Sequence, residues 1–326
     1  MSNTRGGRGP RDNQRGRGRR YDAGPGPDTP KDEPKTEERR PRSPSDRQRM
    51  GAPRRGPNAP RRGAFSDSGP GERPAASTSW DPLAEWYIGW VGEDGSKHHR
   101  LLAIPAVMEA LDVQPGESIL DIGCGHGVLS GYVSKAGGRY TGVDASPRLI
   151  DYARNHHARD GRFFVGDAGD LAAQKELRPG SFDGGVFLLS IQDMEPVGPV
   201  LAGAARMLRP GGRLVLLMTH PAFRVPRQSG WGWDENRKLQ FRRIDRYLTP
   251  LPVPLKSYGD GGGVSRSYHR PLQEYVNGLG AVGLAIDYMN EIPTWKVADA
   301  GPKANAVNTA NREIPLFVAL RAIKIR

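Results

Sequence analysis

The chain has 326 residues, 48 Lys and Arg against 36 Asp and Glu, and one cysteine. A single cysteine excludes an intramolecular disulfide and gives no sign of an oxidising compartment. Because no apolar run approaches the roughly 20 residues that span a bilayer and no signal-peptide core opens the chain, we expect a cytoplasmic protein without a membrane anchor.

The positive charge is unevenly distributed. Residues 1–79 carry 19 Lys and Arg against 10 Asp and Glu, which leaves 29 against 26 for residues 80–326, so the two parts have net charges of +9 and +3. Tyr21 and Phe65 are the only aromatic residues of the first part, which is rich in Arg, Gly and Pro. Too little apolar surface is available there to offset the entropy of ordering. The sequence therefore predicts a disordered tail over 1–79 and one α/β domain over 80–326.

The elements of this domain are predicted in chain order from hydrophobic periodicity and turn residues. Order should begin at the aromatic cluster 80–90, followed by a helix over 101–111 and a turn at Pro115-Gly116. Strands are then expected at 119–122, 139–143, 162–165, 183–189 and 213–219, and helices at about 127–136, 147–157 and 197–208. This alternation predicts a parallel sheet covered by helices on both faces.

The segment at about 220–267 interrupts the alternation with Pro, Gly, Trp and Arg, and it is longer than an ordinary connection. We interpret it as a lid-like insertion over the functional site. A helix near 271–282 and apolar runs at 283–292 and 315–324 can supply the last two strands.

The strongest motif is the glycine-rich loop between the first strand and its helix, where Asp121 precedes Gly123, Gly125 and Gly127. Glycine allows positive φ and close approach of the backbone to a ligand. The third glycine comes one residue earlier than in the pyrophosphate-binding fingerprint. An acid beside the loop suits the cationic amino acid portion of S-adenosylmethionine better than a phosphate. A glycine-rich turn without a ligand is the alternative.

Two further acids follow strands two and three. Asp144 ends the second strand, where a carboxylate can accept hydrogen bonds from ribose hydroxyls, and Asp167 ends the third, where it can accept from an adenine amino group. As isolated residues, both acids would instead be helix caps. Since the carboxyl ends of parallel strands meet at one edge of the sheet, we expect these groups to converge on one ligand.

On the glycine loop and these acids, the chain resembles the class I, Rossmann-like S-adenosylmethionine-dependent methyltransferases over residues 80–326. The resemblance implies a doubly wound, seven-stranded, mostly parallel sheet with an antiparallel last strand. It also implies that Asp121 and the loop hold the methionine end of the cofactor, Asp144 the ribose, and Asp167 with Ala168 the adenine. Further cofactor contacts are expected from the strand-end residues Ala145 and Ser190.

The acceptor is harder to read, because methyl transfer depends mainly on alignment. Gln192 and Asp193 follow strand four and could orient an acceptor, with a loop cap as the alternative. His220 closes strand five, where a neutral imidazole could act as a base or simply be a hydrogen-bonded structural residue. Cys124 is expected to be a packing residue.

Further acceptor candidates come from the insertion and from the segment before strand one. Arg in the insertion suits an anionic small acceptor, unless it pairs with neighbouring acids. The candidates are Arg224, Arg227 and Trp231 of the insertion and Tyr87 and His99 of the earlier segment. No metal site is expected, because the His pairs lack the spacing that places two ligands on one helix face.

The leading hypothesis is thus a methyltransferase that uses S-adenosylmethionine on a small-molecule acceptor. An RNA-binding or RNA-modifying protein is the alternative, since the Arg-Gly segments of the tail could bind RNA weakly. The near-neutral domain argues against RNA as the acceptor. A nicotinamide dehydrogenase with a similar sheet is a third possibility, which the loop spacing opposes.

Overall fold

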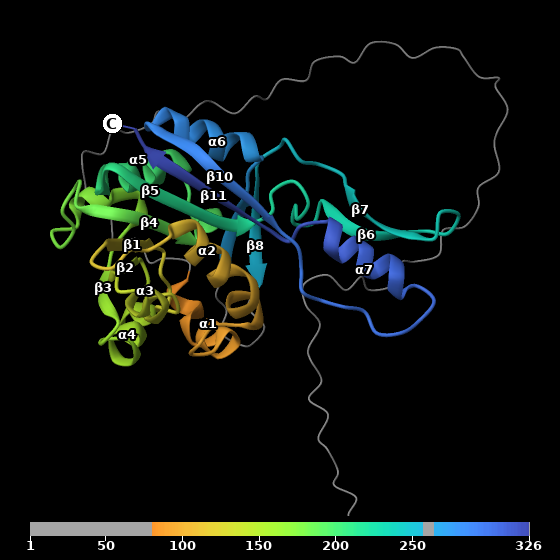
Figure 1. Ribbon diagram of the computed structural model, residues 1–326, viewed down its shortest axis with the longest axis horizontal. Helices are drawn as coiled ribbons and strands as arrows, with labels where there is room; N and C mark the ends of the chain where they lie inside the picture. The colour runs from red at the N-terminus through yellow and green to blue at the C-terminus, as the bar shows by residue number, and fades with distance from the viewer. Residues whose placement is uncertain (1–79, 257–263, 326) are drawn as a thin grey trace, which may run out of the picture. The chain divides into compact units, whose positions relative to one another are not determined.

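The computed structural model describes residues 80–256 and 264–325, so the predicted disordered tail over 1–79 lies outside the described residues. A seven-stranded sheet has the order β10-β11-β5-β4-β1-β2-β3 (Figure 1). Strands β1 to β5 run parallel, whereas β11 is antiparallel to both β5 and β10. The predicted fold is confirmed. The strands are β1 (Ser118–Ile122), β2 (Arg139–Asp144), β3 (Gly161–Val165), β4 (Phe182–Leu188), β5 (Leu208–Thr219), β10 (Leu284–Ile292) and β11 (Phe317–Lys324).

Helices cover both faces of this sheet, because its strands are apolar on both sides. Ile119 of β1 belongs to a core cluster with residues of α2, α3 and α4, and the next residue, Leu120, belongs to a second cluster with residues of α5 and α6. The helices are α1 (Ala84–Val91), α2 (Ile104–Leu111), α3 (Ser130–Lys135), α4 (Pro147–His156), α5 (Val197–Met207), α6 (Leu272–Ala281) and α7 (Ala304–Glu313).

The insertion forms two hairpins. β6 (Ser229–Asp234) pairs with β7 (Leu239–Ile244), and β8 (Leu251–Lys256) pairs with β9 (Val264–His269). α7 packs on β7, and the three elements lie together in Figure 1. β9 instead packs against the short helix η4 (Ile191–Asp193), which follows β4. The second hairpin therefore lies against a segment that the sequence places at the expected site.

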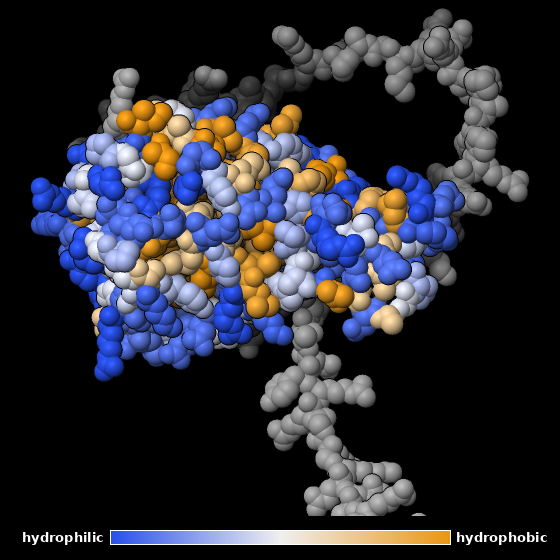
Figure 2. Space-filling view, viewed as in Figure 1, coloured by the Kyte–Doolittle hydropathy of each residue, from blue (hydrophilic) through white to orange (hydrophobic). Residues whose placement is uncertain are grey.

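The exposed apolar surface is spread over several elements. Hydrophobic areas are mixed with hydrophilic ones on the face shown in Figure 2. Large apolar side chains that are exposed include Trp90 of α1, Val276 of α6 and Met289 of β10. In the part of the chain that the structure describes, no helix is long and apolar enough to cross a membrane.

Candidate active site at the carboxyl ends of the strands

The glycine loop folds back over the end of β2. The backbone amides of Gly123 and Cys124 both donate to the carbonyl oxygen of Val143, at 2.7 and 3.1 Å. Gly123, Gly125 and Gly127 have φ values of +73°, +56° and +89°. These conformations favour glycine, so the spacing seen in the sequence has a backbone cause.

Close neighbours also require glycine in this loop. A Cβ atom on Gly123 would lie 2.7 Å from Cβ of Ser190, and one on Gly127 would lie 2.8 Å from the ring of Phe163. At Gly125 the nearest atom would be in the ring of Tyr87, at 3.5 Å. Side chains at Gly123 and Gly127 would therefore overlap their neighbours, whereas Gly125 is in ordinary contact with the ring of Tyr87.

Asp121 is the buried acid at the base of the loop. The Tyr140 hydroxyl donates to its Oδ2 at 2.7 Å, whereas its Oδ1 has no hydrogen-bond partner. Burial raises the pKa of Asp121 to about 7, against the lowering effect of the Tyr140 hydrogen bond. An unpartnered buried carboxylate oxygen costs free energy unless a ligand donates to it. The Oδ1 atom and the glycine loop fit the amino group and methionine chain of S-adenosylmethionine.

Asp144 and Asp167 lie at the ends of the neighbouring strands β2 and β3, beside Ala145 and Ala168. Asp144 accepts hydrogen bonds from the backbone amides of Gly125 and Ser146, both at 2.9 Å, and so joins the loop to the start of α4. Asp167 accepts from Gly169 at 2.8 Å and is exposed. Asp167 thus caps the short helix that follows β3, whereas the cap of α4 is Ser146 and Asp144 instead holds the glycine loop.

Tyr87 of α1 lies among the acids of the site. Burial raises the pKa of its hydroxyl, and Asp144, Asp193 and Asp121 raise it further, which places all three carboxylates near this side chain. The prediction that named Tyr87 from its position before β1 thus identified a residue at the loop.

His99 is buried, and its Nδ1 lies 2.8 Å from the Ser96 hydroxyl. Burial, together with the nearby His126 of the loop, lowers the pKa of His99 to about 4, so its imidazole is neutral at pH 7. It supports the loop side of the site from the segment before α2.

Asp193 faces the insertion. Its Oδ1 is buried without a hydrogen-bond partner, and burial raises its pKa to about 7 against the lowering effects of the Ser267 hydroxyl and the Arg270 guanidinium. Arg270 is 3% exposed and donates to the Met194 carbonyl and the Glu195 carboxylate. Sequence reasoning missed Ser267 and Arg270, because only the pairing of β8 with β9 brings them to η4.

Ser190 and Gln192 hold this segment in place. The Ser190 hydroxyl donates to the Ile122 carbonyl at 2.7 Å. Gln192 donates to the Leu189 carbonyl at 3.2 Å and accepts from the Thr219 amide at 3.3 Å. Leu189 has a φ of +56°, a conformation that is strained for a side chain of its size. The end of β4 is therefore tied to β1 and β5, and this fixes the direction of Asp193.

His220 has both ring nitrogens engaged within the chain. The Ala222 amide donates to Nδ1 at 3.2 Å, so Nδ1 is the acceptor and Nε2 carries the proton that is donated to Glu291 at 2.8 Å. Burial lowers the pKa of His220, against the raising effect of Glu291. The role of general base stays a prediction for His220, and this geometry supports a positioning role.

The remaining insertion candidates surround Trp231. The Arg224 and Arg242 guanidinium groups lie 5.1 and 5.2 Å from its ring centroid. Arg224 also donates to the carbonyls of Pro315 and Ile314, just before β11, while Arg227 is exposed. Arg224, Arg242 and Trp231 therefore form one cluster in the insertion.

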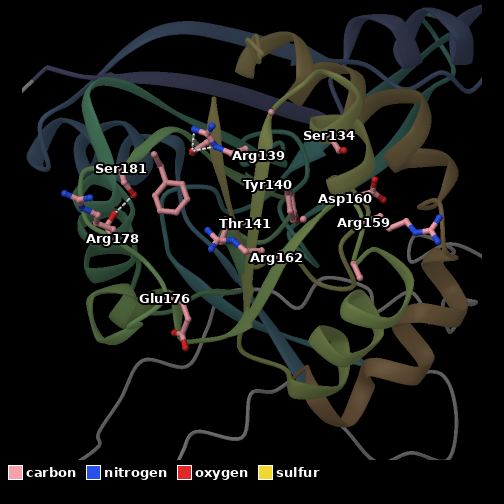
Figure 3. A pocket seen from close by; sticks show the side chains of 15 residues that line it. Ser134, Arg139, Tyr140, Thr141, Arg159, Asp160, Arg162, Glu176, Arg178 and Ser181 are labelled. Atoms are coloured by element: carbon pink, nitrogen blue, oxygen red, sulfur yellow. Dashed lines mark hydrogen bonds between the residues drawn. The ribbon is translucent and has the colours of Figure 1, made fainter. Parts of the chain in front are cut away.

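A groove with a volume of about 680 Å³ lies away from the glycine loop, at the amino ends of β1 to β4 (Figure 3). Ligands of open parallel sheets bind at the carboxyl ends of the strands, so this groove is not the cofactor site. Among residues 80–256 and 264–325, no group of three or more His, Cys, Asp or Glu side chains is arranged to hold a metal ion.

In this sheet β11 lies between β10 and β5 and is antiparallel to both. The sheet, the glycine loop after β1 and the acids after β2 and β3 together define a Rossmann-like nucleoside-binding protein. Residues 120–216 match the family model described as a methyltransferase domain. An S-adenosylmethionine-dependent methyltransferase structure from Mesorhizobium loti is 26% identical, covers 67% of this chain and 96% of its own, and has a TM-score of 0.52. The matched region is thus a methyltransferase domain of the class I, S-adenosylmethionine-dependent kind, which confirms the predicted family and cofactor for this domain.

Curated relatives match the same region. A ubiquinone biosynthesis O-methyltransferase from Xanthomonas euvesicatoria is 30% identical over 42% of this chain and 58% of its own length. A demethylmenaquinone methyltransferase from Tropheryma whipplei is 35% identical over 36% of this chain and 48% of its own. The matches thus span about half the length of these relatives.

Proposed function

We propose that the chain transfers the methyl group of S-adenosylmethionine to a small-molecule acceptor. The observation that carries this proposal is the buried Asp121 carboxylate with its unpartnered Oδ1, next to a loop that side chains cannot occupy. The sulfonium of the cofactor supplies an electrophilic methyl group, so the protein has to align the acceptor and exclude water.

In this proposal the cofactor is held by the predicted residues. Asp121 and the loop from Gly123 to Gly127 hold the methionine portion, and Ser190 closes the loop from the β4 side. Asp144 with Ala145 holds the ribose, and Asp167 with Ala168 holds the adenine. The positions of these residues at adjacent strand ends support the assignment.

On the acceptor side, we assign the acid-base role to Asp193. A buried carboxylate with a pKa raised to about 7 can accept a proton near neutral pH, and its free Oδ1 can accept a hydrogen bond from an acceptor hydroxyl. Ser267 and Arg270 position this carboxylate. Gln192 fixes the segment, and His220 acts as a support for the end of β5 rather than as the base.

An oxygen acceptor in a small phenolic molecule is favoured. The relatives from Xanthomonas are named for O-methylation in ubiquinone biosynthesis, and a hydroxyl is the donor that Asp193 Oδ1 requires. Tyr87 adds an aromatic surface beside the loop. The cluster of Arg224, Arg227 and Trp231 could bind an anionic extension of such an acceptor.

The RNA alternative has less support. The relatives from Xanthomonas and Tropheryma are named for small acceptors, and the Arg-Gly segments lie outside the described residues. We place the protein in the cytoplasm, where a chain with a single buried cysteine needs no oxidising environment.

Asp193→Asn tests the acceptor-side assignment. We expect methyl transfer from labelled S-adenosylmethionine to catechol to fall by about 100-fold or more, because a general base contributes that much. Binding of S-adenosylhomocysteine should change less than about twofold, since Asp193 is assigned to the acceptor. The wild-type rate should rise with pH through about 7 as Asp193 ionises.

Asp245→Asn is the matched control, because it removes the same charge from a residue of the insertion that forms an exposed ion pair with Arg243. It should leave the rate unchanged. A normal rate in Asp193→Asn would remove Asp193 from the mechanism while leaving the cofactor site intact. An absence of methyl transfer to any small phenol by the wild-type protein would contradict the proposed acceptor class.

A further inference from the structure

The groove at the amino ends of the strands is lined by four arginines. Arg139 begins β2, Arg162 lies in β3, Arg159 precedes β3, and Arg178 lies in the segment that leads to β4. Figure 3 shows Arg139, Arg162 and Arg178 on one side of the groove and Arg159 on the other. Two strands and two connecting segments thus bring positive charge to one concave surface.

Two of these side chains are held in place. Thr141 pairs with Arg162 across β2 and β3, and Arg139 is two residues before Thr141, so both arginines project from the same face of the sheet. The Arg139 Nε and Nη2 atoms donate to the Ser118 hydroxyl at 3.3 and 3.0 Å. The Arg162 guanidinium lies 5.9 Å from the centroid of the Phe164 ring.

Within the described part of the chain, the four arginines of this groove are not paired with carboxylates, whereas two neighbouring arginines of β5 are. Arg209 pairs with Asp183 at 2.6 Å and Arg213 pairs with Glu117 at 2.5 Å. In the described ranges 80–256 and 264–325, no carboxylate lies within 4.0 Å of the guanidinium nitrogens of the four groove arginines. The two acids of the groove are Asp160, which lies 3.9 Å from His157, and the exposed Glu176. The groove therefore attracts anions.

We propose that this groove binds a small polyanion that carries two or more phosphate groups. The planar guanidinium group matches phosphate oxygens with paired N–H donors, and several such groups around one surface suit a ligand with several charges. The volume of about 680 Å³ lies within the range of small-molecule sites. This site is separate from the cofactor loop, because it lies at the opposite ends of the same strands.

The aromatic residues of the groove favour a free polyphosphate over RNA. Tyr140 and Phe182 line it, but they are only 3% and 4% exposed, so neither offers a face on which a base could stack. Binding of single-stranded RNA depends on such stacking together with phosphate contacts. The groove should therefore recognise phosphates with little preference for an attached base.

The test is a titration of the full chain with inorganic tripolyphosphate at low ionic strength, followed by nuclear magnetic resonance of the arginine Nε–H groups. We expect saturable shifts of the Arg139 and Arg162 signals. The double variant Arg139→Gln/Arg162→Gln should weaken binding at this site by about tenfold or more, because two charge-assisted contacts are lost. Arg312→Gln of α7 removes the same kind of charge elsewhere and should leave the affinity within about twofold.

Several results would overturn the proposal. These are shifts confined to residues 1–79, an unchanged affinity in the double variant, or tighter binding of an oligouridylate than of tripolyphosphate at equal phosphate concentration. Binding of S-adenosylhomocysteine checks that the double variant is folded. If that variant does not fold, Arg178→Gln in the loop provides the same comparison, and an unchanged affinity there would equally refute the site.

Discussion

Replacing Asp121 by Asn should weaken binding of S-adenosylhomocysteine by about 10- to 100-fold while stabilising the ligand-free protein. The loss of affinity follows from removing the charge that accepts the ligand's ammonium group, since a charged hydrogen bond contributes roughly 1.5 to 3 kcal/mol. The gain in stability follows from burial. Asp121 is 1% exposed, and its pKa is raised from 3.8 to about 7, so ionising it in the fold is unfavourable.

The pH dependence of this effect has a definite sign. Because the pKa of Asp121 is higher in the fold than in the unfolded chain, its contribution to stability is present below pH 3.8 and is lost as pH rises through about 7. Wild-type stability should therefore fall over this range by more than that of Asp121→Asn. Ligand affinity of the wild type should rise over the same range as the carboxylate forms.

Thermal melts and calorimetry at pH 5 and pH 8 measure both quantities. Asp151→Asn is the control, because Asp151 is exposed on α4 and its substitution removes an equal charge. Equal pH profiles for the wild type and Asp121→Asn would show that Asp121 does not titrate in this range. If the variant binds S-adenosylhomocysteine normally, the assignment of the methionine portion of the cofactor to Asp121 is wrong.

The second large effect is expected from Gly123→Ala. Its φ of +73° costs a side chain about 1 to 2 kcal/mol, and the new Cβ would lie 2.7 Å from Cβ of Ser190. Ser190 has to move and loses its hydrogen bond to the Ile122 carbonyl. We expect a loss of stability of about 3 to 5 kcal/mol and a loss of affinity for S-adenosylhomocysteine of at least about 100-fold.

Gly116→Ala separates the two causes. Gly116 has a φ of +86°, but a Cβ atom there would meet no atom within 4 Å. The free energy of unfolding of this control should fall only by the roughly 1 to 2 kcal/mol that a positive φ costs a side chain. The control should bind the ligand normally. Chemical denaturation and calorimetry of the two variants give the comparison. Equal effects would show that close contact at Gly123 is unimportant.

The sequence predicted the fold and the loop because both depend on local patterns. Apolar runs separated by helical segments defined the parallel strands, and Asp121, Asp144 and Asp167 could be placed at strand ends from those runs alone. The φ values of the loop glycines then followed from the need for a tight turn after β1. Tyr87 was found for a similar reason, since it lies in an aromatic cluster shortly before β1.

The acceptor side depends on contacts between distant residues, which no local pattern shows. Arg270 reaches Met194 and Glu195 across about 75 positions, through the pairing of β8 and β9. His220 meets Glu291 across 71 positions, a contact that the sequence around either residue does not show. α7 was missed as well, because Ala310 is its only buried residue and its sequence, rich in Asn and Ala, contains few large apolar side chains.

The central claim is that the glycine loop binds S-adenosylmethionine, and calorimetry of the full chain with S-adenosylmethionine, S-adenosylhomocysteine and NAD tests it most directly. We predict saturable one-to-one binding of the first two ligands and no binding of NAD, with Asp144→Ala weakening the affinity by roughly 1 to 3 kcal/mol. Binding of NAD, or failure of both sulfur ligands to bind, would contradict the assigned cofactor site and the methyl transfer proposed from it.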